Sequence, residues 1–232
     1  MPFDGVLEDS FELLSRAIRK DFPGRIALVS SFGAESAVLL HMVSEINPAT
    51  PVLLNETGML FPETLDYQRQ LASELMLTNV RIIRPTQAEL CRTDPDGDLH
   101  RRDIDACCLL RKVEPVQRAL QPYAAWITGR KRFQAGLRSD LPLTERDDAY
   151  RVKYNPLVFW QPEQLKAYMT EHGLPAHPLV ARGYKSIGCA PCTTPAAEHE
   201  GARAGRWRDT DKTECGIHLE NGRVVRTLIS RV

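Results

Sequence analysis

The stretch IALVSSFGAESAVLLHMVSEI, residues 26–46, decides the fold of this 232-residue chain. Residues 25–32 form a short apolar, partly β-branched run that predicts a buried strand. Apolar residues at helical spacing follow from Ser36, after a short loop that contains Gly33. A strand, a short glycine-containing loop and a helix in this order indicate the first unit of a parallel α/β sheet.

The same alternation recurs further along the chain. TPVLLNETG (50–58) and NVRIIRP (79–85) predict two more strands, and PETLDYQRQLASELM (62–76) predicts a helix between them. YAAWITGRKRFQ (123–134) predicts a strand that runs into a basic loop, and QPEQLKAYMTEHG (161–173) predicts a further helix. We therefore predict an α/β fold with a doubly wound, mostly parallel sheet and helices on both faces.

The last part of the chain lacks this regular pattern. From about Pro195 onward the residues are polar and charged, with little apolar periodicity. We predict one domain over residues 1–195, which holds the nucleotide and cysteine sites described below. A mobile tail over residues 196–232 then carries Cys215.

Charge and composition exclude several classes of function. Lys+Arg and Asp+Glu both number 30, so the chain has no global basic field of the kind that binds nucleic acid. No segment approaches the roughly 20 consecutive apolar residues of a membrane span, and the N-terminus has no long apolar core of a signal peptide. We expect a cytoplasmic protein without nucleic-acid or membrane partners. The sequence does not give the oligomeric state, and a homo-oligomer is among the outcomes.

The loop SSFGAES, residues 30–36, is the first candidate binding site. A turn between a strand and a helix presents backbone N–H groups and hydroxyls at the positive end of the helix, where a phosphate or sulfate binds. The loop lacks the lysine of a Walker motif, so γ-phosphoryl transfer is not indicated. An ordinary strand-to-helix turn is an equal alternative for this pattern alone. The candidate residues are Ser30, Ser31, Gly33 and Ser36.

Four of the six cysteines form a second candidate site. Cys107 and Cys108 are adjacent, and Cys189 and Cys192 form a C-x-x-C motif. Adjacent residues on a helix point about 100° apart, which crowds a single tetrahedral ion, whereas a [4Fe–4S] cluster offers separate iron atoms. The four thiols therefore favour a [4Fe–4S] cluster over structural zinc. A transient disulfide and inert buried thiols remain alternatives, and Cys91 is expected to be a packing residue.

Cys215 lies in KTECGIH, residues 212–218, with no second cysteine in its segment. A lone thiol on a polar tail is a poor cluster ligand, but it suits a nucleophile that reaches a substrate and then a second protein. An unreactive surface cysteine is the alternative. Basic residues near these sites are candidates for binding phosphate or sulfate, although a single such residue is more often a solvated surface charge. They are Lys112, Arg130, Lys131, Arg132, Arg203 and Arg206.

These motifs, in this order, resemble the thioredoxin-dependent sulfonucleotide reductases, and specifically the assimilatory adenylyl-sulfate (APS) reductases. The resemblance covers the chain from about residue 25 to residue 218. The matching stretches are SSFGAES (30–36), ETGMLFPETLDY (56–67), CCLLRKVEP (107–115), WITGRKRFQ (126–134), YNPLVFW (154–160), HPLVARGYKSIGCAPCT (177–193), RAGRW (203–207) and KTECGIH (212–218).

The resemblance implies an adenine-nucleotide α-hydrolase-like fold, in which the loop 30–36 holds the phosphate or sulfate of the nucleotide. It also implies that the Cys215 thiolate attacks the sulfur of APS, expels AMP and forms a Cys S-sulfonate. Reduced thioredoxin, or a glutaredoxin-like protein, then releases sulfite for sulfate assimilation and cysteine biosynthesis.

The resemblance further assigns roles to individual residues. Lys112 matches the lysine beside the cluster and is assigned to catalysis. Arg203 and Arg206 match the arginines of an RxGR motif that closes over the substrate, and Arg132 of the basic loop is assigned to substrate binding. The implied cofactor is one [4Fe–4S] cluster, with the ligands Cys107, Cys108, Cys189 and Cys192.

Three alternatives remain at this point. A reductase of 3′-phosphoadenylyl sulfate (PAPS) would share the fold, but that branch typically lacks the cluster cysteines, so APS is favoured. A PP-loop sulfurtransferase with structural zinc is disfavoured, because such enzymes usually carry a second glycine and an aspartate in the loop 30–36. A non-enzymatic redox or metal-binding regulator is the third alternative, and the segment with Cys215 is the feature that distinguishes it from an enzyme.

Overall fold

A six-stranded sheet forms the centre of the computed structural model, which describes residues 3–134, 136–208 and 210–218. The strand order is β3-β2-β1-β4-β6-β5, and neighbouring strands are parallel except for β5 and β6. This arrangement confirms the predicted mostly parallel α/β sheet. The strands are β1 (Ile26–Ser30), β2 (Val52–Asn55), β3 (Val80–Ile83), β4 (Ala125–Ile127), β5 (Thr144–Arg146) and β6 (Val152–Tyr154).

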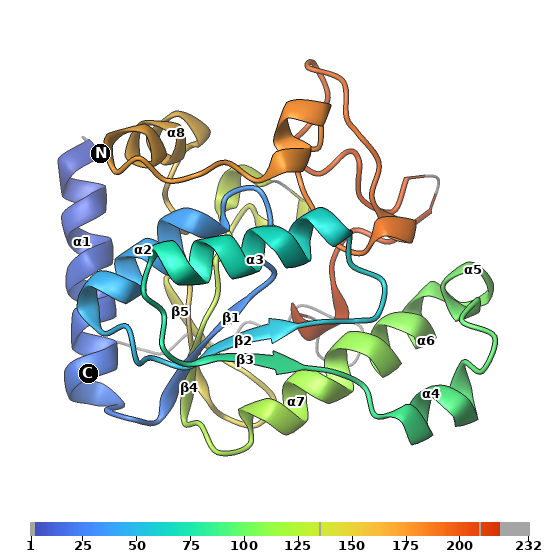
Figure 1. Ribbon diagram of the computed structural model, residues 1–232. Coiled ribbons are helices and arrows are strands. Elements are labelled where there is room, and N and C mark those ends of the chain that lie inside the picture. The colour runs from blue at the N-terminus through green and yellow to red at the C-terminus, as the bar shows by residue number, and fades with distance from the viewer. Residues whose placement is uncertain (1–2, 135, 209, 219–232) are drawn as a thin grey trace.

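Helices cover both faces of the sheet, as a doubly wound fold requires (Figure 1). α1, α2, α3 and α8 contribute to one large apolar cluster, while α7 packs in a smaller cluster against the other face. The α-helices are α1 (Phe3–Arg16), α2 (Ser36–Ile46), α3 (Pro62–Glu74), α4 (Gln87–Thr93), α5 (Leu99–Arg102), α6 (Ile104–Cys108), α7 (Glu114–Leu120) and α8 (Pro162–Glu171).

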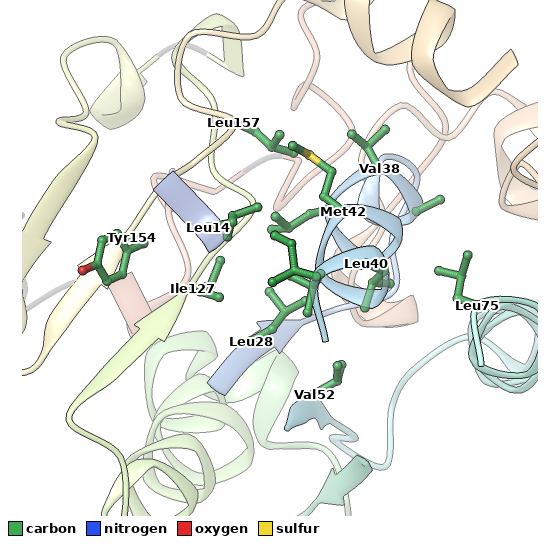
Figure 2. Close-up of a cluster of buried hydrophobic side chains, with 14 of the residues drawn as sticks. Leu14, Leu28, Val38, Leu40, Met42, Val52, Leu75, Ile127, Tyr154 and Leu157 are labelled. Carbon is green, nitrogen blue, oxygen red and sulfur yellow. The ribbon is translucent and has the colours of Figure 1, made fainter. Parts of the chain in front are cut away.

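The burial of β1 explains its uninterrupted apolar sequence. All five of its residues are buried, because β1 has a strand on each side and helices over both faces. Ile26 and Leu28 belong to the larger apolar cluster, and Ala27 and Val29 belong to the smaller one. Figure 2 shows part of the larger cluster, where side chains from α2 meet Leu28 of the sheet.

The order of the strands places the loops after β1 and β4 side by side. The chain passes from β1 to β2 and β3 in one direction, and then returns to β4 on the opposite side of β1. In open parallel sheets, ligands bind in the crevice at the carboxyl ends of the strands where the order reverses. The loop 30–36 follows β1, and the basic loop that starts at residue 128 follows β4.

The helix that carries Cys107 and Cys108 changes its winding beyond them. α6 ends at Cys108, a π-helical turn η2 (Leu109–Val113) follows, and α7 begins at Glu114. Pro115 is the second residue of α7, where the lack of a backbone N–H costs little. π-helical turns of this kind are frequent at functional sites.

The sequence did not predict β5 and β6. Each strand has three residues, and Glu145 and Lys153 at their centres are charged but buried. The two strands form an antiparallel pair at the edge of the sheet. Glu145 pairs with Arg130, which lines the site described below.

The C-terminal segment packs against the body of the protein over its described residues, 196–208 and 210–218. The backbone N–H of Trp207 donates to the backbone carbonyl of Cys192 at 3.1 Å, and the Trp207 side chain is buried. In Figure 1 this orange and red segment lies at the end of the sheet toward which the β2 and β3 arrows point. The mobility of the segment stays a prediction, and residues 219–232 of the predicted tail lie outside the described residues. No described helix is long and apolar enough to cross a membrane.

Candidate active site

A pocket of about 190 Å³ opens at the carboxyl ends of β1, β2 and β4. The loop 30–36, the π-helical turn and the C-terminal segment all contribute to its lining. The sequence-predicted residues that line it are Ser30, Ser31, Gly33, Ser36, Lys112, Arg203, Arg206 and Cys215. The structure thus brings together residues from distant parts of the sequence, from Ser30 to Cys215. Arg132, the other residue predicted to bind substrate, does not line the pocket.

The loop 30–36 has a tightly folded backbone. The Phe32 N–H donates to the Ser30 hydroxyl at 3.1 Å, and Phe32 is fully buried with a positive φ of 47°. A Cβ at Gly33 would lie 3.2 Å from the carbonyl oxygen of Ile187, a tight contact that favours glycine where these two backbones approach. α2 begins at Ser36 and runs for 11 residues, which directs its positive end toward the pocket.

The basic loop after β4 supplies cations that already have carboxylate partners. Lys131 Nζ lies 2.7 Å from Glu35 Oε2, which also accepts from Gln134 Nε2 at 3.2 Å. Arg130 pairs with the buried Glu145 of β5, and burial lowers the pKa of Arg130 to about 9. Glu35, Arg130 and Lys131 line the pocket, whereas Glu145 lies behind Arg130.

Arg132 points away from this wall. Its Nε donates to the Leu141 carbonyl at 2.9 Å, and its guanidinium lies 4.7 Å from the centre of the Phe159 ring. Arg132 starts a 3-10 turn, η3 (Arg132–Gln134), in which successive side chains point in different directions. Its neighbours Arg130 and Lys131 line the pocket instead.

Arg206 offers the pocket a guanidinium with free hydrogen-bonding capacity. It lies over the Trp207 ring, with 4.4 Å between the guanidinium carbon and the ring centre. Among the described residues, the buried Nε of Arg206 has no hydrogen-bond partner. A Cβ at Gly188 would collide with the Arg206 guanidinium, so the glycine of SIGCAPC lets this side chain reach the pocket. A buried N–H donor without a partner is costly unless a ligand accepts from it.

Cys215 reaches the pocket from the C-terminal segment and is partly exposed. Its backbone N–H donates to Glu214 Oε1 at 2.8 Å, and its carbonyl accepts from the His218 N–H at 3.0 Å. The His218 ring stacks on Trp126 with 6.1 Å between ring centres. Burial first, and then the charge of Arg130, hold the pKa of His218 well below its usual value, so the imidazole is neutral. Cys215 therefore lies directly before a short 3-10 turn, η7 (Gly216–His218), and its backbone is held by Glu214 on one side and by His218 on the other.

The four cysteines that were predicted to bind a metal lie on two segments beside the pocket. Cys107 and Cys108 end α6, Cys189 precedes the 3-10 turn η6 (Ala190–Cys192), and Cys192 is the last residue of that turn. The thiol of Cys189 lies 3.2 Å from the Thr57 hydroxyl. Cys107, Cys108 and Cys189 are buried and Cys192 is half-buried.

Lys112 lies among these thiols and connects them to the pocket. Burial alone would lower the pKa of Lys112, but the interaction with the ionised forms of Cys189, Cys215 and Cys108 outweighs burial and raises the pKa. The charge of Lys112 in turn acts to lower the pKa values of Cys108 and Cys192, against the larger effect of their burial. The ammonium group thus stands between the cysteines of the second site and the nucleophile candidate of the first.

The chemistry of the four thiols suits a shared metal centre. Burial raises the pKa of Cys107 to about 11 and that of Cys108 to about 12, so these thiols are protonated near pH 7, and a metal that binds them would have to displace their protons. Within residues 3–134, 136–208 and 210–218, no three His, Cys, Asp or Glu side chains are arranged to hold a single metal ion. The ligand assignment of these cysteines therefore stays a prediction.

Several pocket residues were missed by the sequence analysis. Glu35, Arg138, Glu214 and His218 all line the pocket, and none was assigned a role. Glu214 and His218 belong to the KTECGIH stretch, which was a signal for them, whereas nothing local marks Arg138. The expectation that Cys91 is a packing residue was wrong, because its side chain is exposed.

Comparison with known proteins agrees with this geometry. Residues 25–195 match the family model described as the phosphoadenosine phosphosulfate reductase domain. An adenosine 5′-phosphosulfate reductase from Mesorhizobium japonicum is 51% identical over 208 residues, which cover 90% of this chain and 82% of that protein. A phosphoadenosine 5′-phosphosulfate reductase from Gloeobacter violaceus is 40% identical over 210 residues, which cover 89% and 87% of the two chains.

Solved structures show the same relationship. The phosphate complex of phosphoadenylyl-sulfate (PAPS) reductase from Candida auris aligns with a TM-score of 0.69 and 31% identity, over 83% of this chain and 94% of that chain. An FMN adenylyltransferase from Candida glabrata aligns with a TM-score of 0.61 over 91% and 75% of the chains, but at 14% identity it shows the fold alone. These likenesses confirm the predicted adenine-nucleotide α-hydrolase-like fold. The chain therefore belongs to the phosphoadenosine phosphosulfate reductase domain family.

Proposed function

We propose that the protein reduces APS to sulfite and AMP through an S-sulfonate on Cys215, in sulfate assimilation and cysteine biosynthesis. One observation carries this proposal: the thiol of Cys215 shares a single pocket with the loop 30–36 and with Arg206, whose buried Nε lacks a partner among the described residues. A nucleophile, an anion-binding loop and an available cation are what transfer of a sulfuryl group to sulfur requires.

The first step follows from these positions. The loop 30–36 and the positive end of α2 hold the phosphosulfate group, while Arg206 and Lys112 offset charge on the oxygens. The Cys215 thiolate attacks the sulfur atom, a new S–S bond forms, and the S–O bond to the phosphate breaks. The bonding electrons leave with AMP, so cations near the phosphate lower the barrier. Arg203, partly buried beside Glu214, completes this part of the lining.

The second step requires a dithiol reductant of the thioredoxin or glutaredoxin class. One of its thiolates attacks the Cys215 sulfur, sulfite leaves with the electron pair of the S–S bond, and a mixed disulfide forms. The second thiol of the reductant then displaces Cys215 as a thiolate, and the reductant is left as its disulfide. The docked segment that carries Cys215 must open for this step, which is why we propose that residues 196–232 form a mobile tail on a domain of residues 1–195.

We further propose that Cys107, Cys108, Cys189 and Cys192 hold one [4Fe–4S] cluster. When bound, the cluster supplies structural support and negative charge next to Lys112, and the reductant supplies both electrons of the reaction. Anaerobically prepared protein should then contain about four iron and four sulfide per chain. Stoichiometric zinc without iron would support the sulfurtransferase alternative instead.

The choice of APS over PAPS is open to a direct test. The name of the Mesorhizobium japonicum relative favours APS, whereas the Gloeobacter violaceus relative and the Candida auris structure are named for PAPS. Sulfite release is measured with each nucleotide and reduced thioredoxin, at the same protein concentration. We expect a higher kcat/KM for APS. A clear preference for PAPS would change the assigned substrate, and no sulfite from either would overturn the proposed function.

A further inference from the structure

Glu214 precedes the proposed nucleophile and makes an unusually complete set of contacts for a buried carboxylate. Its Oε2 accepts from Arg138 Nε at 2.5 Å. Its Oε1 accepts from Arg138 Nη2 at 2.8 Å, from Arg203 Nη2 at 3.3 Å, and from the Cys215 N–H at 2.8 Å. Burial alone would raise the pKa of Glu214, but the hydrogen bonds and charge of Arg138, the charge of Arg203 and the hydrogen bond from the Cys215 N–H lower it to about 2. Glu214 is therefore ionised, and it links Arg138 to the backbone of Cys215.

Arg138 is fixed from its other side as well. Its Nη1 donates to Gln134 Oε1, and Gln134 Nε2 donates to Glu35 Oε2 at 3.2 Å. Glu35 belongs to the loop 30–36, so one chain of hydrogen bonds runs from the anion-binding loop to the residue that carries the thiol. All three nitrogens of the Arg138 guanidinium donate to protein acceptors. Arg138 thus differs from Arg206, whose Nε remains available for a ligand.

From this geometry we propose that Glu214 and Arg138 form a clamp that positions Cys215 for attack, an inference that rests on the proposed function. The clamp holds the peptide before Cys215 at a fixed distance from the loop 30–36. It also neutralises a carboxylate that would otherwise repel both the thiolate and the incoming sulfate. Neither residue needs to contact the substrate, so both are positioning residues.

A positioning role predicts a loss in the chemical step and little change in binding. Glu214→Gln keeps the shape of the side chain, but it removes the charge that holds Arg138. We expect the rate constant for S-sulfonate formation to fall about 10- to 100-fold, because small displacements of a nucleophile have large effects on rate. The affinity for AMP should stay within about threefold, since ground-state contacts are retained.

The experiment uses full-length protein that has been incubated anaerobically with iron and sulfide. S-sulfonate formation is followed in single turnovers with APS and no reductant, and AMP binding is measured by calorimetry. Hydrogen exchange of peptides that cover residues 210–218 reports on the docked segment without any turnover. Glu214→Asp retains the charge on a shorter side chain and should be faster than Glu214→Gln.

Two further variants make the test specific. Arg138→Lys keeps the charge but loses the two-pronged hydrogen bond to Glu214, so it should slow S-sulfonate formation as Glu214→Gln does. The double variant should be no slower than the slower single variant by more than about threefold, because both changes remove the same interaction. Arg118→Lys is the matched control, since Arg118 makes a similar pair of hydrogen bonds to Glu89, at 2.8 and 3.1 Å, outside the pocket.

Several outcomes would overturn the proposed clamp. An unchanged rate of S-sulfonate formation in Glu214→Gln would overturn it, and so would multiplicative effects in the double variant. A loss of AMP affinity that parallels the loss of rate in Arg138→Lys would show that Arg138 binds the substrate instead. If wild-type protein forms no S-sulfonate at all, the proposed function fails. The clamp is then judged by hydrogen exchange alone, which should be at least about fivefold faster in Glu214→Gln if the clamp exists, and unchanged if it does not.

Discussion

The Asp94 carboxylate and the Arg111 guanidinium form a buried ion pair that joins three segments beside the cysteines. Arg111 Nη2 and Nε donate to Asp94 Oδ2 at 2.6 and 3.1 Å, and the two side chains are 8% and 0% exposed. Arg111 Nη1 also donates to the Thr57 carbonyl at 2.9 Å, and the Thr57 hydroxyl contacts the Cys189 sulfur. The pair therefore holds the cysteine-bearing helix against the loop after β2 and the Cys189 segment.

Asp94→Asn should destabilise the protein strongly. The substitution leaves the buried charge of Arg111 without a counterion, and breaking a buried pair in this way typically costs about 3–5 kcal/mol. The free energy of unfolding, measured by denaturant titration at pH 7, should fall by an amount in this range. The exposed pair between Arg69 and Asp66 provides the comparison, since Asp66→Asn should cost less than about 1 kcal/mol. Equal losses for the two variants would contradict the structural role of the Asp94 pair.

Arg206→Ala should weaken the binding of AMP and raise the KM for APS. A hydrogen bond to a charged group contributes about 1.5–3 kcal/mol, which corresponds to a loss of affinity of about 10- to 100-fold. Calorimetry with AMP measures the effect in the absence of turnover. Arg208→Ala is the control, because Arg208 lies two residues away and pairs with Glu200 outside the pocket. An affinity equal to that of the wild type in Arg206→Ala would show that the free Nε does not serve the ligand.

His177 should make the stability of the fold depend on pH. Its Nδ1 accepts from the Leu179 N–H at 3.1 Å, its Nε2 lies 3.0 Å from the Thr64 hydroxyl, and burial lowers its pKa to about 4. Since the unfolded chain titrates near pH 6.5, it binds more protons than the folded protein between pH 6.5 and 4, so stability falls as the pH drops through this range.

The size of this effect is measurable by denaturant titration at two pH values. The free energy of unfolding should be about 2 kcal/mol lower at pH 5 than at pH 7 through His177 alone. His177→Gln removes the titrating group, so its stability should decline less over the same interval. Identical pH dependence in wild type and variant would show that His177 does not titrate as the structure indicates.

Local sequence patterns predicted the framework of the fold because the forces involved are local. The apolar run of β1, the loop with Gly33 and the helical spacing of α2 lie within 21 consecutive residues, and the structure has them as expected. The strands β5 and β6 escaped prediction because a three-residue strand with a buried charge at its centre has no apolar signature. Glu145 is buried there only because Arg130 and Lys153 surround it.

The candidate site was predicted only in part, because sequence motifs give the segment on which a residue lies but not the direction of its side chain. Motifs placed Cys215, Arg206 and the loop 30–36 on the correct segments, but the direction of a side chain within a loop depends on the backbone. Arg132 was therefore chosen, although Arg130 and Lys131 line the pocket. The clamp could not be predicted, because Arg138 and Glu214 are 76 residues apart and neither has a local pattern that indicates the other.

The most direct test of this account is mass spectrometry of the protein after incubation with APS in the absence of a reductant. We predict that the peptide containing Cys215 gains the mass of one sulfonate group, in a yield that matches the AMP released, and that added reduced thioredoxin removes the group as sulfite. Cys215→Ser should bind AMP normally and form no adduct. An adduct on another cysteine, or AMP release without any adduct, would contradict the assignment of Cys215 as the nucleophile.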